Sequence, residues 1–228
     1  MDEETRSRRL WREQDKHEGD RQRLFTAVSE AFPANRVLYV GSFVDIAPSF
    51  VFDDVTYVDI DRRASRFFDN ASTVDAIIRE HRAGEAHWRF IRADYRGKLD
   101  LEPGSFDLVL SLYTGPASDT CGQFVRPGGH FLANSSHGEV ALLALDERFA
   151  LEAVVTSRTG SYGVKLTELE DYLIPKRPPH PSRAEILSQG RGIAYTRSPF
   201  AYVFRRIGRS AERPHLLQPA TGRCVVKR

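Results

Sequence analysis

Short apolar runs alternate along this chain with segments whose apolar residues recur at helical spacing. The runs expected to be strands are Val37–Val40, Val55–Ile60, Trp88–Ile91, Phe106–Leu112 and His130–Ala133. Helical patterns fall near Thr73–Arg82, Ser118–Val125 and Glu139–Leu145. Strands that alternate with helices are typical of a parallel sheet covered by helices. The sequence therefore predicts an α/β domain.

The chain divides into three parts. Residues 1–33 form an N-terminal helical extension, because Leu24, Phe25, Val28 and Phe32 recur at helical spacing before Pro33. Residues 34–207 form the main domain, and residues 208–228 form a basic C-terminal tail.

The alternation of predicted strands and helices changes towards the end of the main domain. Two further strands are expected at Phe149–Thr156 and Phe200–Ile207. The patterns Thr167-x-x-Glu170 and Ser182-x-x-Glu185 match capping boxes, which predict two short helices between these strands. The glycine-bounded segment Gly160–Gly163 either closes over a substrate or is a plain hairpin connection.

Composition is that of an ordinary globular protein. Of the 228 residues, 41% are hydrophobic and 28% charged, which argues against wholesale disorder. No apolar run approaches the roughly 20 residues that a membrane helix needs, and no signal peptide pattern is visible. The two cysteines, Cys121 and Cys224, support neither a disulfide framework nor a metal site. We expect a cytoplasmic protein without a membrane partner; the sequence sets no oligomeric state.

Positive charge is concentrated at the C-terminal end. Residues 205–228 contain seven basic residues and one acidic residue, whereas the net charge of the whole chain is only +2. Such a tail can bind nucleic acid through phosphate contacts. A solubilising terminus is the favoured interpretation, because no aromatic residues for base stacking are interleaved.

The first expected strand ends in a loop that begins Gly41-Ser42-Phe43. Glycine here lets a ligand approach the backbone, at the edge where open α/β sheets bind ligands. The loop is not the G-x-G-x-x-G dinucleotide fingerprint, since Phe43 and Ile46 stand in place of the later glycines. A nucleoside cofactor without phosphates, which needs no such cradle, is therefore favoured over NAD or FAD.

Carboxylates follow the second and third expected strands. Asp59 lies 18 positions after Gly41 and can accept hydrogen bonds from ribose hydroxyls. Asp61 is either a further ligand contact or the cap of the following helix. Asp94 can accept a hydrogen bond from an adenine amino group, and its position as third in this order gives it weight.

In order and spacing, these segments resemble the motifs of class I S-adenosylmethionine (SAM)-dependent methyltransferases. The resemblance covers roughly residues 36–207 and rests on Val37–Gly41, Thr56–Asp59, Ala93-Asp94, Phe106–Leu110 and Val125–Leu132. It implies a Rossmann-like fold with a mostly parallel seven-stranded sheet that ends in a reversed hairpin. The Arg126-Pro127-Gly128-Gly129 stretch is expected to be a tight turn into the fifth strand.

The resemblance also implies how SAM would lie. The Gly41 loop would face the methionine moiety, Asp59 the ribose and Asp94 the adenine. The full set of expected cofactor contacts is Gly41, Ser42, Phe43, Asp59, Ile60, Asp61, Asp94, Tyr95 and Ser111. No metal ligand is expected. The family's Gly-x-Gly-x-Gly loop is replaced here by Gly41-Ser42-Phe43-Val44-Asp45, and the first helix is cut short around Pro48, so the chain looks like a separate branch of the superfamily.

Candidates for the chemistry follow the fourth and fifth strands. Tyr113 and Asn134 are expected to border the acceptor. His137 is a candidate general base, because an imidazole pKa near 6.5 suits proton removal at neutral pH. The alternative is that Ser136-x-x-Glu139 is a capping box and that His137 is only a first-turn residue.

The predicted function is methyl transfer from SAM to a small-molecule or peptide-sized acceptor. The Asn-Pro-Pro-Tyr motif that clamps a planar amine in base methyltransferases is replaced by Leu112-Tyr113-Thr114-Gly115-Pro116. Three alternatives stay open. They are a SAM- or nucleoside-binding module without turnover, a nucleic-acid methyltransferase that uses the basic tail, and aminopropyl-type transfer from a SAM-derived cofactor.

Overall fold

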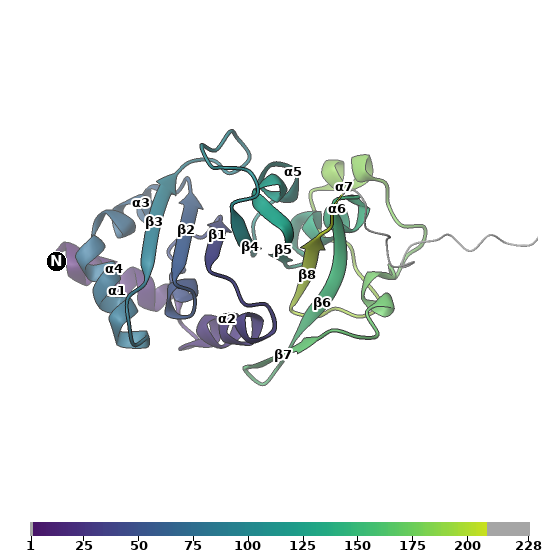
Figure 1. Cartoon of the computed structure of the whole chain (residues 1–228). Coiled ribbons are helices and arrows are strands. Elements are labelled where there is room, and N and C mark those ends of the chain that lie inside the picture. The colour runs from purple at the N-terminus through teal and green to yellow at the C-terminus, as the bar shows by residue number, and fades with distance from the viewer. Residues whose placement is uncertain (1, 209–228) are drawn as a thin grey trace, which may run out of the picture.

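The computed structural model describes residues 2–208, which form one mixed sheet with helices on both faces (Figure 1). The strand order is β3-β2-β1-β4-β5-β8-β6-β7. The bounds are β1 Arg36–Val40, β2 Asp54–Asp59, β3 His87–Arg92, β4 Phe106–Ser111, β5 Val125–Ala133, β6 Phe149–Arg158, β7 Ser161–Lys165 and β8 Ala201–Arg206. Strands β1 to β5 are parallel, and β8 runs antiparallel between β5 and β6. This confirms the Rossmann-like class I methyltransferase fold with its reversed hairpin.

The sheet has eight strands, one more than expected. The added strand is β7, which begins inside the glycine-bounded segment after β6 and pairs antiparallel with β6. The Tyr162 hydroxyl donates to Asp20 Oδ2 at 2.8 Å, and Arg23 Nε donates to the Gly160 carbonyl at 2.7 Å. The segment is therefore a hairpin fixed to the N-terminal helices, as the second of the two interpretations proposed.

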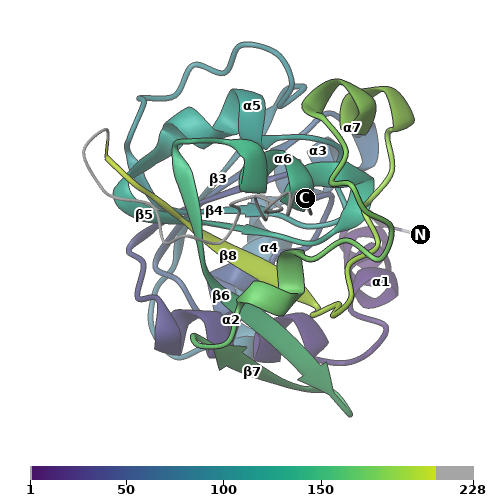
Figure 2. The same ribbon diagram turned by 90° about the vertical axis from the view of Figure 1, so that its right-hand side faces the viewer.

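Helices cover the two faces of the sheet in two groups. One face carries α1 Glu3–Gln14, α2 Asp20–Ala31, the 3-10 turn η1 Ala47–Phe50, α3 Arg62–Asp69 and α4 Ala71–His81. The remaining helical elements are α5 Ser118–Cys121, η2 Gly122–Phe124, η3 Ser136–Gly138, α6 Glu139–Leu145, η4 Glu170–Leu173 and α7 Arg183–Gln189. In Figure 2, α2 lies below the sheet and α5 above it.

Alternation along the strands separates two apolar clusters. In β1, Val37 and Tyr39 join the cluster beneath α1 to α4, whereas Leu38 and Val40 join the cluster on the opposite face. This is the period of two expected for a strand buried on both faces. Because Trp11 of α1 and Leu24 of α2 are buried in the first cluster, the N-terminal helices share the core of the sheet.

Three local expectations were wrong. The Arg126–Gly129 stretch lies within β5, beside an irregularity in the β4–β5 pairing, and is not a separate turn. Thr167 caps no helix, since the short turn η4 starts only at Glu170 and has no side-chain cap. Ser136 does not cap α6, whose N-cap is Gly138. In contrast, Ser182 and Glu185 form the complete capping box expected for α7.

The basic tail after Gly208, which includes Cys224, lies outside the described residues. None of the helices within residues 2–208 is long and apolar enough to cross a membrane. The first crossover is short, as expected from Pro48: only the turn η1 separates β1 from β2. The Gly41 loop is therefore followed by a compact turn instead of a full helix.

Candidate functional site

The predicted residues gather at the carboxyl ends of the parallel strands. Val40 of β1 pairs in register with Val58 of β2 on one side and with Ser111 of β4 on the other. Ser111 pairs in turn with Ala133 of β5. The segments that follow these four strands therefore begin side by side, at the edge where open α/β sheets bind ligands.

Two features of its surroundings favour glycine at position 41. Its φ of +64° lies in the left-handed region, and its N–H donates to the Val58 carbonyl at 2.8 Å. A Cβ at this position would overlap Thr114 Cγ2 and lie 3.6 Å from Tyr95 Cε1. The glycine thus permits the segment after β4 to pack directly on the loop after β1, a contact that sequence reasoning did not identify.

Asp59 joins the loop after β1 to the end of β2. Its Oδ2 accepts from the Phe43 N–H at 2.7 Å, and its Oδ1 accepts from the Asp61 N–H at 2.8 Å. An ionised carboxylate has about four acceptor positions, so each oxygen keeps a lone pair for a ligand. Ile60 beside it is 60% exposed, which places an apolar surface next to the carboxylate.

The other two carboxylates are oriented by arginines close in sequence. Asp61 is the N-cap of α3 and pairs with Arg63 at 2.7 Å, and hydrogen bonding to Arg63 lowers the pKa of Asp61. Asp94 accepts from the Arg96 N–H at 3.0 Å and pairs with its guanidinium at 2.8 Å, which lowers the pKa of Asp94. Within residues 2–208, no three His, Cys, Asp or Glu side chains converge as a metal-binding group.

Tyr113 and Asn134 are brought together as predicted. The Tyr113 N–H donates to Asn134 Oδ1 at 3.1 Å, and the Tyr113 side chain is 58% exposed. Ser111 is less accessible, because it is buried and its hydroxyl lies 2.5 Å from the Thr114 hydroxyl. The exposed side chain at the end of β4 is therefore Tyr113.

Three residues other than glycine have a positive φ at this edge. They are Phe43 at +48°, Tyr113 at +60° and His137 at +52°, in the segments after β1, β4 and β5. Each such conformation costs of the order of 1–3 kcal/mol and persists only where the surroundings fix it. Strained residues of this kind concentrate at functional sites, so their grouping here marks the edge as a candidate site.

His137 is exposed, and its Nδ1 lies 3.3 Å from the Gly190 carbonyl. Because a carbonyl oxygen only accepts, Nδ1 carries the proton in this contact. The lone pair is then on Nε2, so Nε2 is the ring nitrogen available to accept a proton. The ring is thus oriented by the segment after α7, which is distant in sequence.

The buried carboxylate of Glu139 is hydrogen-bonded to the backbone of the segment after β4. The carboxylate is 1% exposed and accepts from the N–H groups of Ala117 at 2.9 Å and Ser118 at 2.7 Å. Burial raises the pKa of Glu139 to about 7. The Tyr95 hydroxyl accepts from the Gly115 N–H at 3.0 Å, so side chains fix this segment at several points.

A pocket of about 420 Å³ opens beside Tyr113. Its wall consists of residues 13–17 at the end of α1, Asp20 and Arg21 of α2, Tyr113 itself and Phe200. The Tyr113 and Phe200 rings meet edge to face, with 6.5 Å between their centroids. The pocket therefore adjoins the end of β4, although its walls come from segments that sequence reasoning had not connected with the site.

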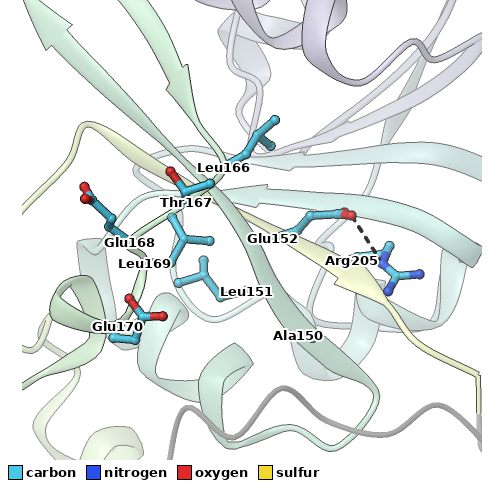
Figure 3. Close-up of a pocket in the computed structure, with 9 residues that line it drawn as sticks. All are labelled: Ala150, Leu151, Glu152, Leu166, Thr167, Glu168, Leu169, Glu170 and Arg205. Carbon is cyan, nitrogen blue, oxygen red and sulfur yellow. Dashed lines mark ion pairs between the residues drawn. The ribbon is translucent and has the colours of Figure 1, made fainter.

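A second pocket lies in the antiparallel part of the sheet (Figure 3). It is bordered by residues 150–152 of β6, residues 166–170 after β7, and Arg205 of β8. Its central carboxylate, Glu152, pairs with Arg205 at 3.4 Å and with His130 at 2.7 Å. This pocket contains none of the residues predicted to bind cofactor or acceptor.

No protein-family model and no curated protein sequence matches the chain. Solved structures that resemble it include the N-methyltransferase NodS from Bradyrhizobium japonicum, with 14% identity, 85% of this chain and 97% of that chain covered, and a TM-score of 0.47. A SAM-dependent methyltransferase from Methanosarcina mazei has 14% identity, coverages of 79% and 97%, and a TM-score of 0.42. The tRNA (m1A58) methyltransferase TrmI from Aquifex aeolicus has 11% identity, coverages of 81% and 68%, and a TM-score of 0.46. Because these identities and TM-scores are low, the assignment of the fold rests on the strand order and strand pairing of the chain itself.

Proposed function

We propose that this chain, which has the class I methyltransferase fold, is a SAM-dependent methyltransferase acting on a small-molecule or peptide-sized acceptor. One observation carries the proposal. Gly41 and Asp59 follow adjacent parallel strands, and the Asp59 carboxylate is hydrogen-bonded to the loop that Gly41 begins. A nucleoside ligand in such a fold binds across these strand ends, with a carboxylate on its ribose.

The residues at this edge suit SAM. Asp59 keeps free lone pairs for the two ribose hydroxyls, and the exposed Ile60 offers an apolar surface to the adenine ring. Asp94 is the acceptor we assign to the adenine amino group. When bound, the cofactor supplies an electrophilic methyl group, so the transfer needs no covalent intermediate on the protein.

The chain's own residues then orient the acceptor. Direct transfer depends chiefly on the alignment of nucleophile and methyl carbon. Asn134 fixes the backbone of Tyr113, so the exposed Tyr113 ring is held at the end of β4. His137, with its Nε2 lone pair free, is the candidate base for an acceptor that must lose a proton.

A SAM- or nucleoside-binding module without turnover is the second candidate function, because one specific contact favours it. Thr114 packs against Gly41, in the space that a ligand facing the glycine loop would approach. A protein that binds the nucleoside part of SAM but leaves the sulfonium away from an acceptor would have this arrangement.

Product analysis separates these functions. The protein is incubated with SAM labelled either in its methyl group or in its methionine chain, together with cell extract divided into small-molecule, peptide and nucleic-acid fractions. We expect methyl label in the small-molecule or peptide fraction, with S-adenosylhomocysteine (SAH) as the second product. Binding without consumption favours the module, and label in nucleic acid favours the tail-dependent alternative. Transfer of the chain label as a 3-amino-3-carboxypropyl group, with methylthioadenosine as the second product, favours the non-methyl, aminopropyl-type alternative.

A further inference from the structure

Arg21 connects the N-terminal helix α2 with two segments at the candidate site. Its Nε lies 3.3 Å from Asp45 Oδ2, in the loop that follows β1. On another side, the guanidinium carbon lies 5.2 Å from the centre of the Tyr113 ring, in the segment that follows β4. We expect the first of these segments to face the methionine moiety of the cofactor and the second to border the acceptor. One side chain therefore contacts both sides of the proposed reaction site.

Asp45 is the most buried group in the loop after β1. Its side chain is 1% exposed, Oδ2 also accepts from the Tyr39 hydroxyl at 3.1 Å, and Oδ1 accepts from the Ala47 N–H at 3.3 Å. Its own N–H donates to the Ser42 carbonyl at 3.0 Å, which closes the loop. Burial raises the pKa of Asp45, and the charge of Arg21 counteracts that rise. A buried carboxylate without a partner is costly, so the conformation of this loop depends on Arg21.

The Tyr113 ring needs a restraint of its own. The hydrogen bond to Asn134 fixes the backbone of Tyr113 but does not set the direction of the ring, which is 58% exposed. The Arg21 guanidinium lies against this ring and also 6.0 Å from the centre of the Phe200 ring. Attraction between a cation and an aromatic ring is stronger where water is excluded, and the Arg21 side chain is only 16% exposed. Arg21 therefore restrains the orientation of the Tyr113 ring.

Local preferences do not explain a basic residue at position 21. Helix α2 begins at Asp20, so Arg21 lies in its first turn, where a positive charge opposes the helix dipole. Other residues already anchor this end of α2, because Asp20 accepts from the Tyr162 hydroxyl at 2.8 Å and Arg23 donates to the Gly160 carbonyl at 2.7 Å. The contacts of Arg21 are therefore directed at the candidate site and are not required to hold the helix.

We propose that Arg21 is a positioning residue for methyl transfer. Through Asp45 it fixes the loop that faces the methionine part of SAM, and through the Tyr113 ring it fixes the wall that borders the acceptor. Because direct transfer depends on the alignment of nucleophile and methyl carbon, a residue that contacts both sides influences that alignment. The N-terminal extension then belongs to the reaction site. The role in methyl transfer rests on the function proposed above.

The cofactor side is tested by calorimetric titration with SAH and with methylthioadenosine, which lacks the amino-acid part of SAH. The variant Arg21→Gln/Asp45→Asn removes both charges, so it leaves no uncompensated buried charge that would impair folding. We expect this variant to bind SAH about tenfold more weakly than the wild-type protein and to bind methylthioadenosine nearly as tightly. Arg21→Lys, which keeps a positive charge beside Asp45, should bind SAH nearly as tightly as the wild-type protein.

The acceptor side is tested without any ligand, by NMR on protein with isotopically labelled tyrosine rings. The Tyr113 signal is identified by its absence from the spectrum of Tyr113→Phe. We expect this signal to shift in Arg21→Gln/Asp45→Asn, whereas the signal of Tyr195, which packs in the cluster on the opposite face, stays in place. The matched control Arg23→Gln removes another tertiary contact of α2 and should alter neither the Tyr113 signal nor SAH binding.

Three results would overturn the proposal. They are unchanged SAH binding in the double variant, an equal weakening of SAH and methylthioadenosine binding, which indicates a general structural effect, and an unchanged Tyr113 signal. Absence of SAH binding to the wild-type protein would contradict the proposed function and this inference with it. If the wild-type protein binds SAH, any of the three results overturns this inference alone.

Discussion

Replacing the buried Glu139 by glutamine should remove a pH dependence from the stability of the protein. Burial is the largest influence on Glu139 and raises its pKa from 4.5 to about 7. An acid whose pKa is higher in the folded than in the unfolded state binds its proton more tightly in the folded state. Its contribution to stability is therefore fully present below pH 4.5, falls as the pH rises towards 7, and is constant above that range.

The magnitude follows from the difference between the two pKa values. A rise of about 2.5 pH units corresponds to about 3 kcal/mol at 1.36 kcal/mol per unit. By the linkage relation, about 2.5 kcal/mol of this change in the free energy of unfolding occurs between pH 5 and pH 8. Glutamine does not titrate, so the variant lacks this term while other groups titrate as before.

Urea unfolding at pH 5, 6, 7 and 8, followed by tryptophan fluorescence, measures the effect. The stability of the wild-type protein relative to Glu139→Gln should fall by about 2–3 kcal/mol from pH 5 to pH 8. The control Glu170→Gln, at an exposed carboxylate, should follow the wild-type curve. Identical pH dependence in the wild-type and Glu139→Gln proteins would refute the reasoning.

Substitutions at Gly41, Asn134 and His137 give three further tests of the site. Gly41→Ala should lower the melting temperature, because of its positive φ and the overlap with Thr114, and adding Thr114→Ser should recover part of the loss; no recovery would show that the overlap is not the cause. Asn134→Ala should cost about 1–3 kcal/mol in urea unfolding by leaving the Tyr113 N–H unpaired, while Asn134→Asp, which keeps the acceptor, should cost less. His137→Ala should lower turnover about 10²–10⁴-fold and leave SAH affinity intact, and a fully active variant would exclude His137 as the base.

The fold was largely predictable from hydrophobic periodicity. The elements that this periodicity did not predict have physical causes. Strand β7 was missed because Ser161–Lys165 is only half-buried and has a glycine at its centre, a pattern that also suits a loop. Helix α3 was indicated only by Asp61 as a possible cap, and its extent was not predicted because three arginines surround Ala64, Phe67 and Phe68, the residues that it buries. Short elements with little buried surface give a weak periodic signal.

Part of the site was predictable because strand order brings strand ends together. Gly41 and Asp59 meet in this way, as do Tyr113 and Asn134. Arg21 and Glu139 were not identified, because their contacts are made across the fold. The pattern Ser136-x-x-Glu139 predicts a local cap, but the buried carboxylate of Glu139 instead binds backbone groups 21 and 22 residues earlier. Local patterns do not indicate when a tertiary contact replaces a local one.

Calorimetric titration with SAH tests the central claim, that a SAM-type cofactor binds where β1 and β2 end. We expect the wild-type protein to bind one SAH per chain. Asp59→Ala should weaken binding at least tenfold, because charge-assisted contacts to the ribose are lost. Asp69→Ala, which removes an exposed carboxylate at the C-terminal end of α3, serves as the matched control and should change the affinity little. Absence of SAH binding to the wild-type protein would contradict the cofactor assignment, and unchanged affinity in Asp59→Ala would contradict the placement of the ribose.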